Sequence, residues 1–156
     1  MDDKTADALL TQVVRRAMPQ ADADTVSIVA ACSGLLANVA YADRDFSPDE
    51  AKAIERILGE IPGIGSDGTP EIVRALEKHR VELSSVHAVR FARTLNELGT
   101  LELRLHVLGL LVSLAASDET IKPAEVNTLR QVTRALGLEQ ADYNRLQSEH
   151  RKKLAK

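Results

Sequence analysis

The chain has 156 residues, which is within the usual range for one domain, so the sequence predicts a single domain over residues 1–156. Trp is absent, Phe and Tyr occur twice each, and nearly all of the 44% hydrophobic content is aliphatic or alanine. That balance favours helices over a β-sandwich. The formal net charge of -3 excludes an overall positive field for binding nucleic acid or an anionic membrane.

The sequence predicts a cytoplasmic protein that does not span a membrane. The single cysteine, Cys32, has no second cysteine for a disulfide or a thiolate metal site. The acidic, polar start of the chain lacks the basic and apolar segments of a signal peptide. The most apolar stretch, residues 107–116, has about half of the roughly 20 residues that a membrane-spanning helix needs.

Three helices are predicted in the first part of the chain. Residues 6–18 form an amphipathic pattern that Pro19 closes, and with its linker this helix occupies residues 1–22. Residues 24–42 are apolar around most of the circumference, which is typical of a central helix. Ser47 is placed to cap a third helix that begins at Pro48, carries Glu50 in its first turn and ends near residue 60.

Five further helices are predicted after a flexible connector at residues 63–68. Hydroxyl residues mark the starts of the first three, with Pro70 in the first of them, and Gly99 and Gly137 mark two of the helix ends. In the apolar helix that Thr100 opens, His106 is predicted to lie in the core or at its edge. The predicted ranges are about 69–80, 84–98, 100–116, 125–136 and 140–153. No window alternates as a strand does, so the fold class is all-α, with a bundle of seven or eight helices.

An internal duplication becomes visible when the sequence is shifted by 75 residues. Seven of the 25 positions from Gly34 to Leu58 are then identical to their counterparts, and both copies read A-x-[AS]-D-x-x-[FI]-x-P-x-E. Each copy predicts an apolar helix, a tight corner and an amphipathic helix, with core repeats at about 26–60 and 101–137. Two such units packed about a pseudo-twofold axis bury both central helices, which one unit alone cannot do.

With this doubled corner, the sequence resembles the TerB tellurite-resistance family. Leu136-Gly137-Leu138 and Asp142-Tyr143 add to the resemblance, which covers residues 26–146. The same type of domain occurs in a membrane-anchored, DnaJ-like co-chaperone. The resemblance implies an all-helical fold with duplicated units, and acidic residues that hold a divalent cation or a partner. It also implies a stress-response module with membrane-bound or cytoplasmic protein partners.

The acidic residues at matching positions are Asp43 and Glu50 in the first corner and Asp118 and Glu125 in the second. Their carboxylates suit a hard cation, and we consider Ca²⁺, Mg²⁺, Mn²⁺ and Zn²⁺ as candidates. The corners meet at one end of the molecule if the two buried helices run parallel, and lie a helix length apart if they run antiparallel. The alternative is that helix capping and local salt bridges hold both corners without a metal.

Other chemistries find less support in the sequence. Pro48 takes the position where an EF-hand loop needs glycine, and the four histidines have no zinc-site spacing. No catalytic nucleophile, cofactor-binding loop or nucleic-acid-binding surface is indicated. The resemblance therefore implies a TerB-like stress or tellurite-resistance module, which we expect to be non-enzymatic and for which a divalent cation at the acidic corners is the candidate ligand. A plain protein-interaction domain with purely structural corners is the alternative, and the sequence does not determine the oligomeric state.

Overall fold

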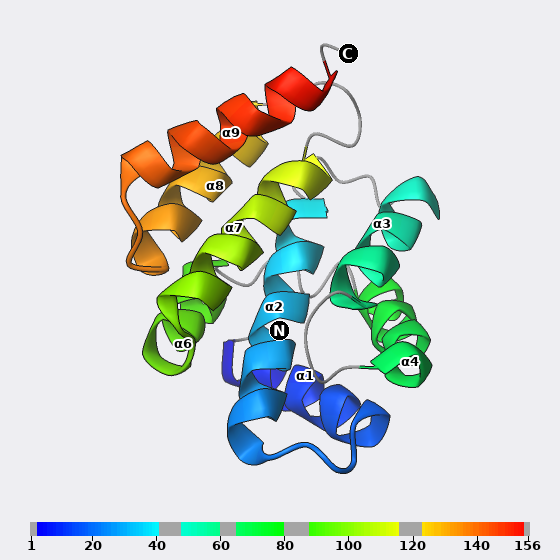
Figure 1. Ribbon diagram of the computed structural model, residues 1–156. Helices are drawn as coiled ribbons and strands as arrows, with labels where there is room; N and C mark the ends of the chain where they lie inside the picture. The colour runs from blue at the N-terminus through cyan, green and yellow to red at the C-terminus, as the bar shows by residue number, and fades with distance from the viewer. Residues whose placement is uncertain (1–2, 41–47, 60–64, 80–87, 116–122, 155–156) are drawn as a thin grey trace.

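The computed structural model describes residues 3–40, 48–59, 65–79, 88–115 and 123–154 (Figure 1). These residues form eight helices and no strand, which confirms the prediction of an all-α fold. The helices are α1 (Asp3–Ala17), α2 (Ala23–Ala40), α3 (Pro48–Gly59), α4 (Gly65–Lys78), α6 (Ala88–Leu98), α7 (Leu101–Ala115), α8 (Pro123–Ala135) and α9 (Gln140–Leu154).

Helix α2 is the centre of the fold, as its apolar circumference predicts. It packs against α1, α6 and α7 along its length and also touches α3, α4 and α8 (Figure 1). The described side chains from Ala30 to Ala37 are all buried. Its mid-helix Ser33 is fully buried and donates a hydrogen bond to the carbonyl oxygen of Val29 at 2.8 Å, so this polar group is satisfied inside the core.

Local signals in the sequence explain where several helices begin. Asp22 precedes α2 and accepts a hydrogen bond from the backbone N–H of Thr25 at 2.7 Å, which also lowers the pKa of the Asp22 carboxyl. The Thr100 hydroxyl accepts a hydrogen bond from the N–H of Leu103 at 3.1 Å and caps α7, as predicted. These side-chain bonds satisfy amides that have no partner within their own helix.

The end of α8 follows the predicted glycine cap. Gly137 has a φ of 74°, a backbone conformation that glycine adopts at little cost. The N–H of Leu138 donates to the carbonyl of Thr133 at 3.0 Å, and the N–H of Gly137 donates to that of Arg134 at 3.0 Å. This bond pair is a Schellman motif, and the buried side chain of Leu138 anchors the turn to the core.

Two predictions from the sequence are wrong. Helix α4 begins at Gly65, so most of the connector expected at residues 63–68 is helical and Pro70 lies inside the helix. Proline at that position removes one backbone hydrogen bond, and the burial of Ile72, Val73 and Leu76 offsets this loss. His106 is exposed rather than at the core, because α7 turns one stripe, which includes Glu102, to solvent.

The helix boundaries repeat at the spacing on which the predicted duplication rests. The ends of α2 and α7 at Ala40 and Ala115 are 75 residues apart, and so are the starts of α3 and α8 at Pro48 and Pro123. The starts of α4 and α9, Gly65 and Gln140, have the same spacing. The duplication itself stays a prediction, because packing differs between the halves: α6 packs on α2 and α8, whereas α1 packs on α2 and α4.

None of the described helices combines the length and the apolar character needed to cross a membrane.

Candidate functional site

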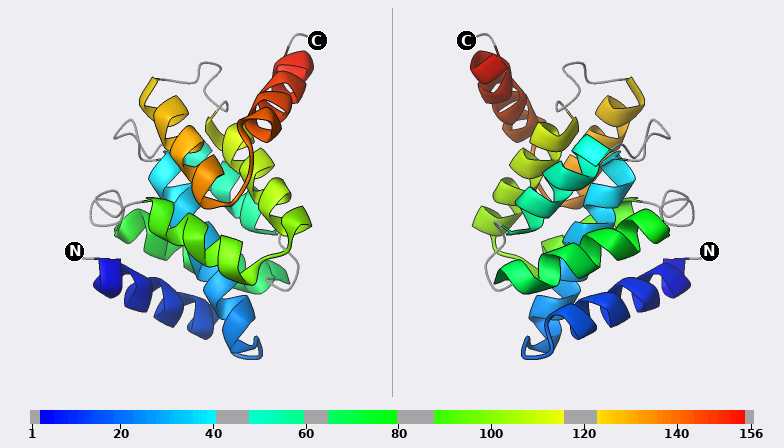
Figure 2. Two further views of the ribbon diagram at one scale, coloured as in Figure 1. Left: turned by 90° about the vertical axis from the view of Figure 1, so that its left-hand side faces the viewer. Right: turned by 90° about the vertical axis from the view of Figure 1, so that its right-hand side faces the viewer.

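The central helices α2 and α7 run in the same general direction and end at the same end of the molecule. Figure 1 shows both C-terminal ends in the upper half, and the side views in Figure 2 agree. Helices α3 and α8 begin at that end too. The sequence left open whether the two buried helices run parallel or antiparallel, and the structure shows that they run parallel. The segments that follow α2 and α7 therefore start from the same end of the bundle.

The acidic corner residues occupy equivalent positions along the chain. Asp43 follows the last residue of α2 by three positions, and Asp118 follows the last residue of α7 by three. Both aspartates lie in the segments 41–47 and 116–122, outside the described residues. Glu50 and Glu125 are each the third residue of a helix, α3 and α8 respectively, and their side chains also lie outside the described part.

The helix ends near the corners have opposite electrostatic preferences. The C-terminal end of a helix carries a partial negative charge, so an acidic residue just beyond α2 or α7 gains nothing from the helix dipole. The first turn of a helix favours a carboxylate, so Glu50 and Glu125 are accounted for by α3 and α8 without a ligand. The helix dipole therefore gives a reason for the two glutamates and none for the two aspartates.

Within the described ranges, no three His, Cys, Asp or Glu side chains come together to hold a metal ion. His106 is exposed and His79 is half-buried. Burial raises the pKa of the Cys32 thiol to about 12, because the charged thiolate would lose its hydration inside the core. Cys32 is thus a small buried hydrophobe, as predicted, rather than a reactive thiol or a ligand.

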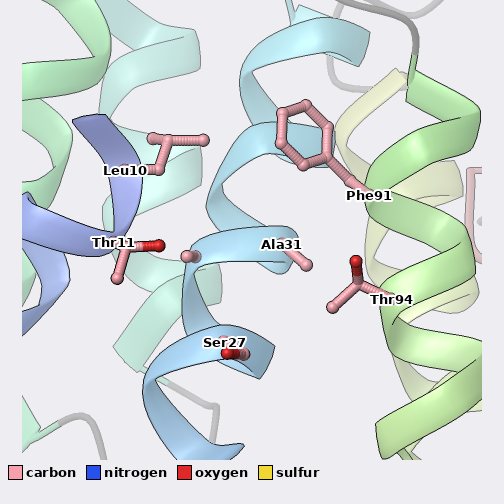
Figure 3. Close-up of a pocket in the computed structure, with 7 residues that line it drawn as sticks. Leu10, Thr11, Ser27, Ala31, Phe91 and Thr94 are labelled. Atoms are coloured by element: carbon pink, nitrogen blue, oxygen red, sulfur yellow. The ribbon is translucent and has the colours of Figure 1, made fainter. Parts of the chain in front are cut away.

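A small pocket of about 160 Å³ lies between α1, α2 and α6, far along α2 from its C-terminal end. Figure 3 shows Phe91 and Thr94 reaching from α6 toward α2, with Leu10 and Thr11 of α1 on the other side. The lining residues are Leu10, Thr11, Ser27, Ala30, Ala31, Phe91 and Thr94, none of them ionisable. This lining offers no general acid, base or nucleophile with an activating partner.

A polar cluster around Arg104 was not predicted from the sequence. Nη1 of this α7 residue donates to the carbonyl oxygen of Leu136 at 2.8 Å and to Oδ1 of Asn96 at 3.1 Å. The guanidinium therefore joins the end of α6 to the end of α8, where a positive charge is favoured by the helix dipole. No local pattern reveals this contact, since Arg104 and Leu136 are 32 residues apart.

Comparison with known proteins identifies one family. The family model described as "Tellurite resistance protein TerB" matches residues 25–148, which run from the first turn of α2 into α9. No curated protein and no solved structure gives a significant match.

Proposed function

The chain belongs to the TerB family, and from this premise we propose that it is a non-enzymatic, tellurite-resistance-type module that binds one divalent cation between its two acidic corners. Asp43 and Asp118 would be the central ligands, with Glu50 and Glu125 beside them. We place its action in the cytoplasm, in a stress or metal response, with membrane-associated or cytoplasmic protein partners.

The observation that carries this proposal is the parallel course of α2 and α7. Asp43 and Asp118 each follow their helix by three residues, and the two helices end at the same end of the bundle. Antiparallel helices would end at opposite ends and would separate the two carboxylates. The dipoles of both helices direct partial negative charge toward that end. A cation would offset this charge and the mutual repulsion of the carboxylates.

The donor chemistry favours a hard cation over a soft one. The four candidate ligands are all carboxylates, which suit Ca²⁺, Mg²⁺ and Mn²⁺, whereas Zn²⁺ sites in proteins are built mainly from histidine and cysteine. A carboxylate set of this kind would supply binding energy and hold the corner segments together.

The second candidate function is a plain protein-interaction domain with structural corners. It is supported by the positions of Glu50 and Glu125 in the first turns of α3 and α8, where the helix dipole already favours them. Pro48 and Pro123 begin these helices and pre-set the backbone angle there, again without a cation.

Thermal unfolding of the metal-stripped protein separates the two candidates. A ligand that binds only the native state stabilises it by about 2.7 kcal/mol at a concentration of 100 times its dissociation constant. We expect at least one of Ca²⁺, Mg²⁺ and Mn²⁺ to raise the Tm, with Zn²⁺ as the soft comparison. The double variant Asp43→Asn/Asp118→Asn should abolish the rise.

The matched control removes two negative charges elsewhere. Asp24 and Glu71 are exposed, in α2 and α4, so Asp24→Asn/Glu71→Gln should keep the full cation response. In the absence of cation, the corner variant should be more stable than the wild type if the two aspartates repel one another. A Tm that no cation raises would reject the metal site and leave the protein-interaction function.

A further inference from the structure

The pocket between α1, α2 and α6 is a groove that is partly open to solvent. Its floor on α2 is made of Ser27, Ala30 and Ala31, whose short side chains leave space between the flanking helices (Figure 3). At Gly34, an added Cβ would lie 2.6 Å from the Phe91 ring, so α6 lies directly on α2 there. Ser27 and Thr94, which also line the groove, lie nearer the start of α2 and the end of α6.

The volume of the groove fits one aliphatic side chain, and its lining combines four apolar residues with the hydroxyl residues Thr11, Ser27 and Thr94. Its volume of about 160 Å³ is close to the ~150 Å³ of an apolar protein cavity that holds benzene. Because no ionisable residue lines it, an ionic ligand would lose hydration without gaining a charged partner. Leu10, Phe91 and the two alanines provide apolar contact for a leucine-sized group.

A side chain of that kind stands beside the groove on the same molecule. Leu98 follows Thr94, a groove residue, by one helical turn and so lies on the same face of α6. It is 40% exposed, and Leu101, just beyond the turn into α7, is 55% exposed. They are the exposed large hydrophobic side chains of the described surface. The bonds of Gly99 to Leu95 and of Leu103 to Thr100 hold this turn in place.

The charges on α6 are self-complementary. Exposed Arg90 and Arg93 lie in its first half and exposed Glu97 in its second. Two copies of α6 placed antiparallel about a twofold axis bring Arg93 of one copy beside Glu97 of the other, twice over. The same arrangement sets Leu98 of one copy opposite the Phe91–Thr94 turn of the other, which lines the groove.

We propose that two copies of this chain associate about a twofold axis through α6, with Leu98 of each copy inserted into the α1–α2–α6 groove of the other. The interface is one helix and one pocket per copy, at the small end of specific protein interfaces, so the dimer dissociates at roughly micromolar concentrations or above. The groove is lined by residues 27–31 of α2, away from the C-terminal end of this helix, which precedes the first acidic corner along the chain.

Sedimentation equilibrium of the full chain from about 10 µM to about 1 mM tests the proposal, because this range spans the expected dissociation. Leu98→Asp places a charge in a groove that no ionisable residue lines and should weaken association at least about tenfold. Arg93→Glu and Glu97→Arg should each weaken it as well, because each creates like-charge contacts. The double variant Arg93→Glu/Glu97→Arg restores opposite charges across the axis and should recover association.

The controls carry the same charge changes on the far side of the molecule. Lys52→Glu and Glu55→Arg alter exposed residues of α3 and should leave the dissociation constant unchanged. Ser27→Phe fills the groove from its partly exposed floor and should abolish association while the helical circular dichroism is retained. A monomer at every concentration overturns the proposal, and so does a dimer that persists in Leu98→Asp or is not recovered by the charge swap.

Discussion

Arg104 shows how one long side chain can connect three helices. Its Nη1 donates to the Leu136 carbonyl and to Asn96, while its Nε is buried without a hydrogen-bond partner in the described part of the chain. We expect Arg104→Ala to lower the free energy of unfolding by about 2 kcal/mol, since hydrogen bonds to a charged group contribute about 1.5–3 kcal/mol and the unpartnered Nε offsets some of this. Urea unfolding measures the change.

Asn96→Ala is the matched comparison for Arg104. It removes one acceptor of the guanidinium and leaves the 2.8 Å bond to Leu136, so its cost should be about 1 kcal/mol or less. Equal costs for the two variants would contradict the view that the contact with the end of α8 is the stronger part of the cluster.

Cys32 makes stability depend on pH in the alkaline range. Burial raises its pKa to about 12 in the folded protein, whereas the unfolded chain has a value of about 9. Above pH 9 the unfolded chain releases the thiol proton and the folded protein keeps it, so unfolding is favoured as pH rises. At pH 10.5 this contributes a loss of about 2 kcal/mol, from ~1.4 kcal/mol per pH unit.

Urea unfolding of the wild type and of Cys32→Ala at pH 7 and pH 10.5 isolates this contribution. Cys32→Ala lacks the ionisable thiol, so its stability should fall less between the two pH values than that of the wild type. An equal loss of unfolding free energy in both proteins would show that ionisation of Cys32 does not cause the pH dependence. Native Cys32 should also resist alkylation at pH 8 and react once the protein is unfolded.

At the scale of the helix, the two aligned glycines Gly34 and Gly109 have different roles. A Cβ on Gly34 would meet the Phe91 ring at 2.6 Å, whereas one on Gly109 would meet only Cδ2 of Leu146, at an ordinary 3.5 Å. We expect Gly34→Ala to destabilise the protein by about 1–3 kcal/mol through overpacking between α2 and α6. Gly109→Ala should be neutral or stabilising by up to about 1 kcal/mol, because alanine favours a helix.

Thermal unfolding of the two glycine variants checks this contrast, and each serves as the control for the other. Similar changes in Tm for both variants would indicate that the close approach of α6 to α2 does not make an added methyl group at Gly34 destabilising. Such a result would favour equivalent roles for the two glycines.

The same helices show what sequence reasoning can and cannot predict. The positions of α2 and α7 follow from apolar residues within each segment, and the cap at Gly137 follows from local backbone chemistry. The early start of α4 was missed because Pro70 normally marks a first turn, and tertiary burial overrides that signal. The Arg104 cluster was missed because its partners come from other helices.

Prediction of the candidate site divides in the same way. The motif identified Asp43, Glu50, Asp118 and Glu125 as equivalent residues, but spacing along the chain does not reveal whether two corners share one end of a bundle. The parallel course of α2 and α7 shows that the helices before the two corners end at the same end of the bundle, while both aspartates lie outside the described residues. The groove beside Leu98 left no motif, because it depends on the gap between α1 and α6, two helices far apart in the sequence.

For the whole molecule, the parallel central helices predict one shared cation site rather than two local ones. Isothermal titration of the metal-stripped protein with Ca²⁺, Mg²⁺ or Mn²⁺ should therefore give one equivalent per chain. Asp43→Asn and Asp118→Asn should each weaken the affinity by about tenfold or more without halving the stoichiometry, because both aspartates would ligate the same ion. The double variant should lose less binding free energy than the sum of the two single losses, since the first substitution already dismantles the shared site.

The control is Asp24→Asn, near the start of α2, which should leave both affinity and stoichiometry unchanged. Two equivalents, one lost with each aspartate, would instead show two independent corners, and the pseudo-twofold arrangement would then have no role in binding.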